Sequence, residues 1–168
     1  MKPSENTTLE ASLSREAYWD DEFFAREREA IFWDQWFYAG RADALSEPGA
    51  YRVLDVAGES VILIRGEDGL NAHLNFCRHR GSRLLCGEGT VRGSIRCPYH
   101  SWAYELDGSL VASPFVPSDA IPEASRRLHR VGVAQWAGFV FVHLSPERAE
   151  ANRETLEAQL GDAPQRVG

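Results

Sequence analysis

Short apolar stretches alternate with turn residues over most of the chain, from residue 36 to residue 144. The stretches are rich in β-branched and aromatic residues and end at Gly, Asp or Pro, which is the pattern of strands joined by tight turns. Pro48-Gly49, Asp68-Gly69 and Asp107-Gly108 are examples of such turn signals. The predicted strands cover 36–39, 51–56, 60–65, 70–76, 90–96, 128–135 and 139–144. Strands this short and closely spaced predict a mainly β fold, an antiparallel sandwich or barrel.

The two ends of the chain have a different pattern. Residues 1–13 are polar and predict a loose arm, whereas 14–36 mixes aromatic and charged residues in a way that fits one or two short amphipathic helices. At the other end, Pro146 is typical of a first helical position and predicts a helix over 146–160 that ends at Gly161. Three prolines in 113–124 predict a surface loop.

These patterns divide the chain into three parts. Residues 1–36 form the arm and the N-terminal helical segment, 37–145 form the strand-rich domain, and 146–168 form a C-terminal helix and tail. A length of 168 residues with 43% hydrophobic residues suits one globular domain with a substantial core.

The charge balance narrows the function classes. The net charge is −7, which argues against nucleic acid or an anionic membrane surface as a partner. No apolar run approaches the roughly 18 residues of a membrane span, and the N-terminus lacks the apolar middle of a signal peptide. We therefore expect a cytoplasmic protein, in which cysteines serve more often as metal ligands or buried thiols than in disulfides.

Two short segments carry the chemistry. Cys77 and His79 form a C-x-H motif, and 17 residues later Cys97 and His100 form a C-x-x-H motif. In a Rieske 2Fe–2S cluster one iron is bound by two cysteines and the other by two histidines. Two loops that each supply one Cys and one His can hold such a cluster from opposite sides. We therefore predict that Cys77, His79, Cys97 and His100 are its ligands, on loops 77–81 and 97–102.

Other interpretations of these four residues fit less well. A Cys₂His₂ zinc site usually pairs C-x₂₋₄-C with H-x₃₋₅-H, and neither spacing occurs here. Blue copper takes one Cys, two His and a weak axial ligand such as Met, but Met1 is the only methionine. Four ordinary core residues in this order would be improbable. The third thiol, Cys86, is predicted to be a small buried residue.

The cluster motifs and their flanks resemble the Rieske domain of the large (α) subunit of aromatic-ring-hydroxylating oxygenases. The resemblance covers about residues 15–165 and includes Phe76-CRHRG, CPYHSW followed by Asp107-Gly108, and upstream Glu29-x-Ile31-Phe32, Trp36 and Pro48-Gly49. It implies a Rieske-type antiparallel β sandwich with a small cluster-binding subdomain and short α-helices at both ends.

The resemblance also implies partners. In that family a flavin reductase, sometimes through a ferredoxin, supplies electrons that the cluster passes to a mononuclear iron in a catalytic domain, often across a subunit boundary in a trimer. His73, His129 and His143 are the remaining histidines, and they lack the spacing of such an iron site. We therefore expect an electron-transfer module whose Fe(II) site is in another domain or subunit; the alternative is a stand-alone Rieske ferredoxin-like carrier.

Residues beside the motifs bear on the reduction potential. High-potential Rieske proteins have an additional Cys pair between the loops and a Ser two residues after the last His; this chain has no such pair, and Trp102 stands at the Ser position. We therefore expect a potential at the low end of the Rieske range of about −150 to +300 mV. Trp102, Tyr99 and Tyr104 are predicted to cover the cluster, and the Ser101 hydroxyl could reach a ligand.

Overall fold

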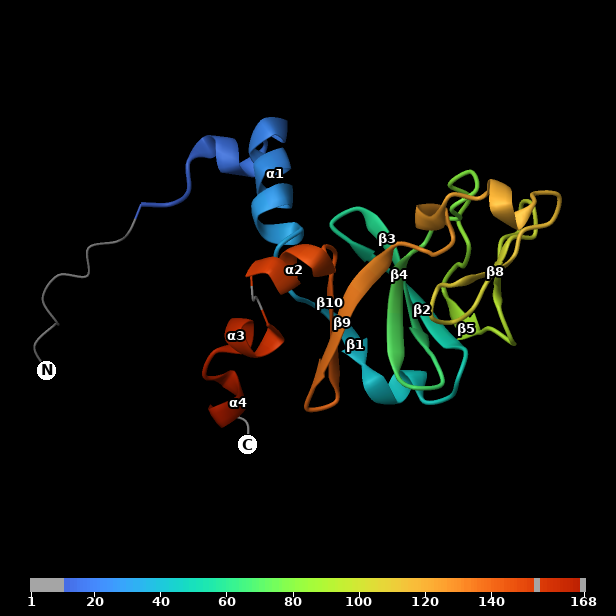
Figure 1. The fold of residues 1–168 in the computed structure, drawn as a ribbon. Helices are drawn as coiled ribbons and strands as arrows, with labels where there is room; N and C mark the ends of the chain where they lie inside the picture. Colours follow the sequence, from blue (N-terminus) through green and yellow to red (C-terminus); the bar gives the residue numbers. More distant parts are fainter. Residues whose placement is uncertain (1–10, 153–154, 167–168) are drawn as a thin grey trace, which may run out of the picture.

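The fold consists of two antiparallel sheets of unequal size, with short helices attached to one side of the larger sheet (Figure 1). It was determined as a computed structural model, which describes residues 11–152 and 155–166. The mainly β, antiparallel fold predicted from the sequence is confirmed. The predicted polar arm lies mostly outside the described residues.

The larger sheet has seven strands in the order β1-β10-β9-β4-β3-β2-β5. Consecutive neighbours such as β2 and β3, or β9 and β10, are joined through tight turns at Ala57-Gly58 and Ala137-Gly138, where all four residues have positive φ. This backbone matches the twist of two-residue hairpins. The strands are β1 Phe37–Arg41, β2 Ala50–Val56, β3 Glu59–Arg65, β4 Leu70–Leu74, β5 Glu88–Thr90, β9 Arg130–Trp136 and β10 Phe139–His143.

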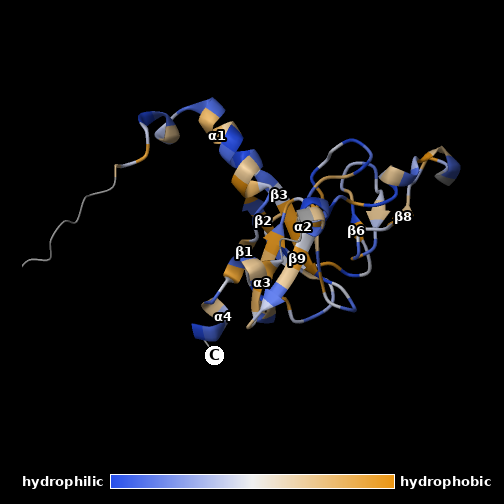
Figure 2. Ribbon diagram, turned by 60° about the vertical axis from the view of Figure 1, so that its left-hand side comes forward, coloured by the Kyte–Doolittle hydropathy of each residue, from blue (hydrophilic) through white to orange (hydrophobic). Residues whose placement is uncertain are grey.

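The smaller sheet has three strands in the order β6-β7-β8 and lies at the end of the molecule away from the helices (Figures 1 and 2). Its strands are β6 Ile95–Arg96, β7 Ala103–Tyr104 and β8 Leu110–Ala112. The two loops that carry the Cys–His motifs lie beside this sheet, since loop 97–102 connects β6 to β7. The small sheet and both loops are called the cluster subdomain below.

Strand β3 joins the two parts of the molecule because both of its faces are buried. Successive side chains of a strand point to opposite faces. Val61 and Leu63 belong to the core of the large sheet, whereas Ile62 and Ile64 belong to a second core shared with the cluster subdomain. The four side chains are at most 1% exposed. Figure 2 shows the resulting apolar band through the strands of the large sheet.

The main helix of the N-terminal helical segment is α1, Asp21–Glu27. Asp20 caps its first turn, because the Asp20 side chain accepts a hydrogen bond from the Phe23 N–H at 2.8 Å. A π-helical turn, Arg28–Phe32, continues it, and a 3₁₀ turn, Arg15–Tyr18, precedes it. Further 3₁₀ turns cover Ala42–Leu45, Ser118–Ala120 and Glu123–Ser125. Among the described residues, no helix is long and apolar enough to cross a membrane.

Two sequence predictions about elements were wrong. The strand predicted over 90–96 is two strands, because Gly93 turns the chain with a φ of 82° and sends β5 to the large sheet and β6 to the small one. The single helix predicted over 146–160 is α2, Pro146–Asn152, and α3, Leu156–Leu160. Thr155 is extended and caps α3 by accepting from the Ala158 N–H. A fourth helix, α4 Ala163–Arg166, follows Gly161 and was not predicted.

Candidate metal centre

The two motif loops are closed by the same backbone hydrogen bonds. In the first, the Cys77 N–H donates to the Ser82 carbonyl at 2.8 Å, and the Cys77 carbonyl accepts from the Gly81 N–H at 2.9 Å. In the second, the Cys97 N–H donates to the Trp102 carbonyl at 2.7 Å, and the Cys97 carbonyl accepts from the Ser101 N–H at 3.1 Å. The two cysteines therefore begin matching six-residue turns.

Each turn needs a left-handed residue at its fifth position. Gly81 has a φ of 68° and Ser101 has a φ of 59°. Glycine adopts this region without a steric penalty, whereas serine does so less readily. The sequence pattern that follows each Cys–His motif thus explains why both loops fold back on their cysteine. The Ser101 hydroxyl, however, is exposed and makes no hydrogen bond to the other described residues, so it does not reach a predicted ligand.

The two predicted cysteine ligands lie together inside the second core. Cys77 and Cys97 are each 2% exposed and belong to the same buried cluster, and each thiol affects the pKa of the other. Burial raises the pKa of the Cys77 thiol. Burial acts in the same direction on Cys97, but the backbone N–H groups of Tyr99 and His100 point at its sulfur and hold the pKa of that thiol below its usual value. One of the two sulfurs is thereby prepared to carry negative charge.

The two predicted histidine ligands lie next to each other at the other side of the site. The ring centroids of His79 and His100 are 4.8 Å apart, with an interplanar angle of 62°. Trp102 stacks in parallel on His79 at 4.9 Å, and Tyr99 packs on His100 at 3.7 Å. Burial, assisted by the nearby His100 and Arg80, lowers the pKa of His79, which favours the neutral ring that a metal ligand requires.

The residues fit a Rieske cluster. The Nδ1 atom of His79 is buried and has no hydrogen-bond partner among the described residues, although buried polar atoms are nearly always paired. An iron atom would supply the missing partner. No three His, Cys, Asp or Glu side chains in the described part of the chain converge on one point. A Rieske cluster takes only two protein ligands per iron, so the paired arrangement of thiols and imidazoles is compatible with it.

Tyr104 supports the cysteine side of the site in a way the sequence did not reveal. It is fully buried, and its hydroxyl lies 3.3 Å from the Cys77 Sγ while accepting from the Arg78 N–H at 3.1 Å. Because the hydroxyl accepts from Arg78, its own proton is available to the sulfur. Burial, together with the contact to Cys77, raises the pKa of Tyr104 and keeps the phenol protonated.

Asn75 fixes the chain on both sides of the first loop. Its side-chain oxygen accepts from the N–H groups of Leu84 and Leu85, and its amide donates to the Leu85 carbonyl and the Ser60 hydroxyl, all within 3.1 Å. The residue is 3% exposed. A polar residue at the end of an apolar strand, two positions before the motif cysteine, was the available sequence signal, and it was missed.

The other candidate residues lie outside the centre. His73, in β4, and His143, in β10, are buried, and His129 is exposed and hydrogen-bonds to Arg78. The prediction that Cys86 is buried was wrong, because its side chain is exposed on the segment that leads from the first loop to β5. Its carbonyl accepts from the Tyr51 hydroxyl.

Paired cysteines and paired histidines on two matching loops beside a small antiparallel sheet define a Rieske-type iron–sulfur protein. Residues 35–134 match the family described as "Rieske [2Fe-2S] domain". The chain belongs to this family, and its relatives show that it is homologous to the α subunits of Rieske oxygenases. A Rieske domain implies a 2Fe–2S cluster.

The relatives are larger proteins. The carnitine monooxygenase oxygenase subunit of Escherichia coli K12 is 35% identical over 160 residues, which are 94% of this chain and 40% of that protein. The crystal structure of the quaternary ammonium Rieske monooxygenase CntA with L-carnitine superposes with a TM-score of 0.81 at 33% identity, over 90% of this chain and 42% of that one. The structure of naphthalene 1,2-dioxygenase with bound indole superposes with a TM-score of 0.76 at 29% identity, over 86% of this chain and 32% of that one. The chain thus spans about two fifths of its monooxygenase relatives.

Proposed function

We propose that this chain is the Rieske electron-transfer module of an oxygenase α subunit. Cys77 and Cys97 would bind one iron of the 2Fe–2S cluster, and His79 and His100 would bind the other. The module would accept single electrons from a reductase or ferredoxin and pass them to a mononuclear iron in a separate catalytic domain. The observation that carries the proposal is the burial of the two thiols together and the pairing of the two imidazoles, on loops with the same backbone closure.

The surroundings of the four residues favour reversible one-electron chemistry. When bound, the cluster supplies a centre that takes up and releases one electron. The buried Tyr104 hydroxyl and the backbone N–H groups of Tyr99 and His100 donate toward the sulfurs, which stabilises added negative charge. Trp102, at 3% exposure, covers His79 and limits access of water. Tyr99 is 60% exposed beside His100, so the imidazole side of the centre is near the surface, where electrons can enter and leave.

The ligand assignment is tested by spectroscopy of purified variants. We expect two irons and two sulfides per chain, visible absorption of a Rieske cluster and, after reduction, its EPR signal. Cys97→Ser removes a proposed ligand and should abolish both signals. Cys86→Ser is the matched control, because this thiol is exposed and outside the site. A colourless protein with one zinc per chain would refute the assignment in favour of a structural zinc site.

The substrate class follows from the more similar relatives. These are monooxygenases of carnitine, and CntA is a quaternary ammonium Rieske monooxygenase whose structure holds L-carnitine as substrate. We therefore propose a trimethylammonium compound, in place of the aromatic ring hydroxylation expected from the sequence, as the substrate of the complete α subunit. The test is oxygen consumption by an α subunit containing this chain, with a reductase, on L-carnitine or naphthalene. Turnover of naphthalene alone would contradict the proposal.

A stand-alone carrier is the alternative function. The N-terminal helical segment favours the oxygenase, since a minimal carrier needs only the sheets and the loops. A neighbouring segment with two His and one carboxylate in the same polypeptide or operon would support the oxygenase assignment. An isolated gene whose product shuttles electrons between two other proteins would support the carrier.

A further inference from the structure

The cluster subdomain carries the opposite charge to the rest of the protein. Residues 76–112, which include both loops and the small sheet, contain five arginines and three carboxylates, Glu88, Glu105 and Asp107, in a chain whose net charge is −7. Glu88 is already paired with Arg52 of β2, at 2.9 Å. The surface around the proposed cluster is therefore a basic patch on an acidic protein.

Of the five arginines of this patch, only Arg78 makes hydrogen bonds with described residues, to the Ala124 carbonyl and to His129. Every described arginine outside 76–112 makes an ion pair, a hydrogen bond or a contact with an aromatic ring, as Arg127 does with Asp107 at 2.5 Å. Arg80, Arg83 and Arg96 are exposed, and their side chains make no hydrogen bond or ion pair with described residues. Arg80 directly follows His79, and Arg96 directly precedes Cys97.

An aromatic side chain is presented at the same end of the molecule. Phe115 is fully exposed and has a φ of 67°, at the third position of a turn closed by the Val116 N–H and the Ser113 carbonyl. That position favours glycine, so a phenylalanine there is strained. Val116 packs on the core that contains both cysteines, and Arg78 of the first loop donates to the Ala124 carbonyl of the same connection. Figure 1 places this connection, which follows β8, beside the cluster subdomain.

We propose that Arg80, Arg83 and Arg96, with Phe115 as an aromatic anchor, form the docking surface for an acidic electron-donor protein. This inference rests on the proposed function, because it assigns an electron entry point to the same centre. An aromatic anchor among arginines is the usual composition of an interface core. One electron passes from the donor to this chain, and no bond forms or breaks. Unpaired charges next to the ligands, Arg80 beside His79 and Arg96 beside Cys97, would steer the donor to the nearest entry point.

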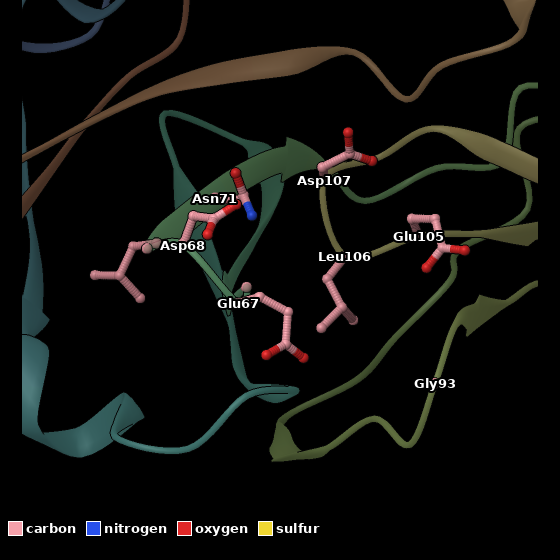
Figure 3. Close-up of a pocket in the computed structure, with 10 residues that line it drawn as sticks. Glu67, Asp68, Asn71, Gly93, Glu105, Leu106 and Asp107 are labelled. Atoms are coloured by element: carbon pink, nitrogen blue, oxygen red, sulfur yellow. The ribbon is translucent and has the colours of Figure 1, made fainter.

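Arg92 provides a matched control. It is exposed and unpaired like the other three, but it lies between β5, which pairs with β2 of the large sheet, and β6, and it does not adjoin a proposed ligand. The N–H of its neighbour Val91 donates to the Gly49 carbonyl. Its other neighbour, Gly93, lines a pocket of about 450 Å³ together with the carboxylates of Glu67 and Glu105 (Figure 3). A donor that docks at the cluster loops would not need this charge.

The experiment measures electron delivery to the cluster-loaded protein. Reduced plant-type 2Fe–2S ferredoxin serves as the acidic probe, because its potential of about −400 mV makes transfer downhill. Stopped-flow absorption gives the second-order rate constant of cluster reduction at low salt and at 0.5 M NaCl. We expect R80Q/R83Q/R96Q to lower the rate about tenfold or more at low salt and to match the parent at 0.5 M NaCl. R92Q should stay within about twofold of the parent.

Phe115→Gly tests the aromatic anchor, because glycine adopts the positive φ of this position without strain. We expect a rate constant of cluster reduction about fivefold lower than that of the parent at both salt concentrations. Dithionite must reduce all variants fully, which shows that each carries a competent cluster. Absence of the cluster would refute the proposed function itself. A loaded cluster that the ferredoxin does not reduce, or reduces at a rate insensitive to salt and to the three arginines, would overturn the docking surface alone. The docking surface would also be overturned if sedimentation velocity shows that the substitutions dissociate a dimer, because the surface would then bind a second copy of this chain.

Discussion

Replacing Tyr104 with phenylalanine isolates one hydrogen bond to the proposed cluster. The hydroxyl lies 3.3 Å from the Cys77 Sγ and accepts from the Arg78 N–H at 3.1 Å. Phenylalanine keeps the ring in the core, where Tyr104 is fully buried, and removes only the hydroxyl. The reduced cluster carries one more negative charge than the oxidised cluster, so a donor to its sulfur stabilises the reduced state more. The substitution should therefore lower the reduction potential.

The size of the shift follows from the energy of a single charged hydrogen bond. Such a bond contributes about 1.5–3 kcal/mol. The added electron spreads over the whole cluster, and we assign about a third of that energy, roughly 0.5–1 kcal/mol, to the difference between the two redox states. For a one-electron couple about 1.4 kcal/mol corresponds to 59 mV, so the expected decrease is about 20–45 mV.

The potential is measured by titration monitored through the visible absorption and EPR of the cluster. Tyr99→Phe is the matched control: it also removes a phenol near the site, but that side chain is exposed and its hydroxyl makes no hydrogen bond to described residues. Burial raises the pKa of Tyr104, so the shift should be constant from pH 6 to pH 9. An unchanged or increased potential in Tyr104→Phe, with the cluster fully loaded, would refute the assigned role.

Three further predictions concern stability and assembly. Burial lowers the pKa of His73, so below pH 6.5 the unfolded chain binds a proton that the folded chain does not, and the folded state loses stability as the pH falls. His73→Gln should reduce this loss by up to about 1.4 kcal/mol per pH unit, measured by urea unfolding at pH 7.5 and 5.5. Asn75→Ala leaves the Leu84 and Leu85 N–H groups unpaired and should cost about 3 kcal/mol or more, with loss of cluster absorption; wild-type unfolding midpoints would contradict this. Ser101→Gly relieves a left-handed serine and should stabilise the protein by about 0.5–1 kcal/mol with an unchanged spectrum, and a lower melting temperature would count against it.

Hydrophobic pattern and turn chemistry were sufficient to predict most of the large sheet. Strands β2, β3, β9 and β10 lie within two residues of the predicted bounds, because each is an apolar stretch limited by a turn. The small sheet was harder, since β6 and β7 have two residues each and show no alternation. Their pairing depends on the closure of the loops between them, which is a tertiary effect. The break at Thr155 was missed because a capping threonine inside a helical pattern resembles an ordinary helical residue.

The centre was predictable as far as its residue types and spacing, but its supporting contacts were not. Cys–His motifs specify which side chains come together. The hydrogen bond from Tyr104 to Cys77 depends instead on how β7 packs against the first loop, because the two residues are 27 positions apart in the sequence. Asn75 likewise acts through backbone groups of Leu84 and Leu85, so its position after an apolar strand could mark it as unusual but could not identify its partners. Phe115 was included in the predicted loop 113–124, but its complete exposure and positive φ could be found only in three dimensions.

The ligands and hydrogen-bond donors of the proposed cluster predict a reduction potential between those of plant-type ferredoxins and high-potential Rieske proteins. Two neutral imidazoles raise the potential above the about −400 mV of all-cysteine plant-type clusters. A second cysteine pair between the loops is impossible, because Cys86 is the only thiol besides the two proposed ligands. High-potential Rieske proteins have a serine two residues after the last histidine, where this chain has Trp102, so that hydroxyl donor is missing. Tyr104 restores one donor, which by itself accounts for only tens of millivolts. We therefore predict a value between about −150 mV and zero, low in the Rieske range, so that an acidic ferredoxin docked at Arg80 would deliver its electron downhill. A titrated potential well above zero would mean that donors beyond Tyr104 control the cluster.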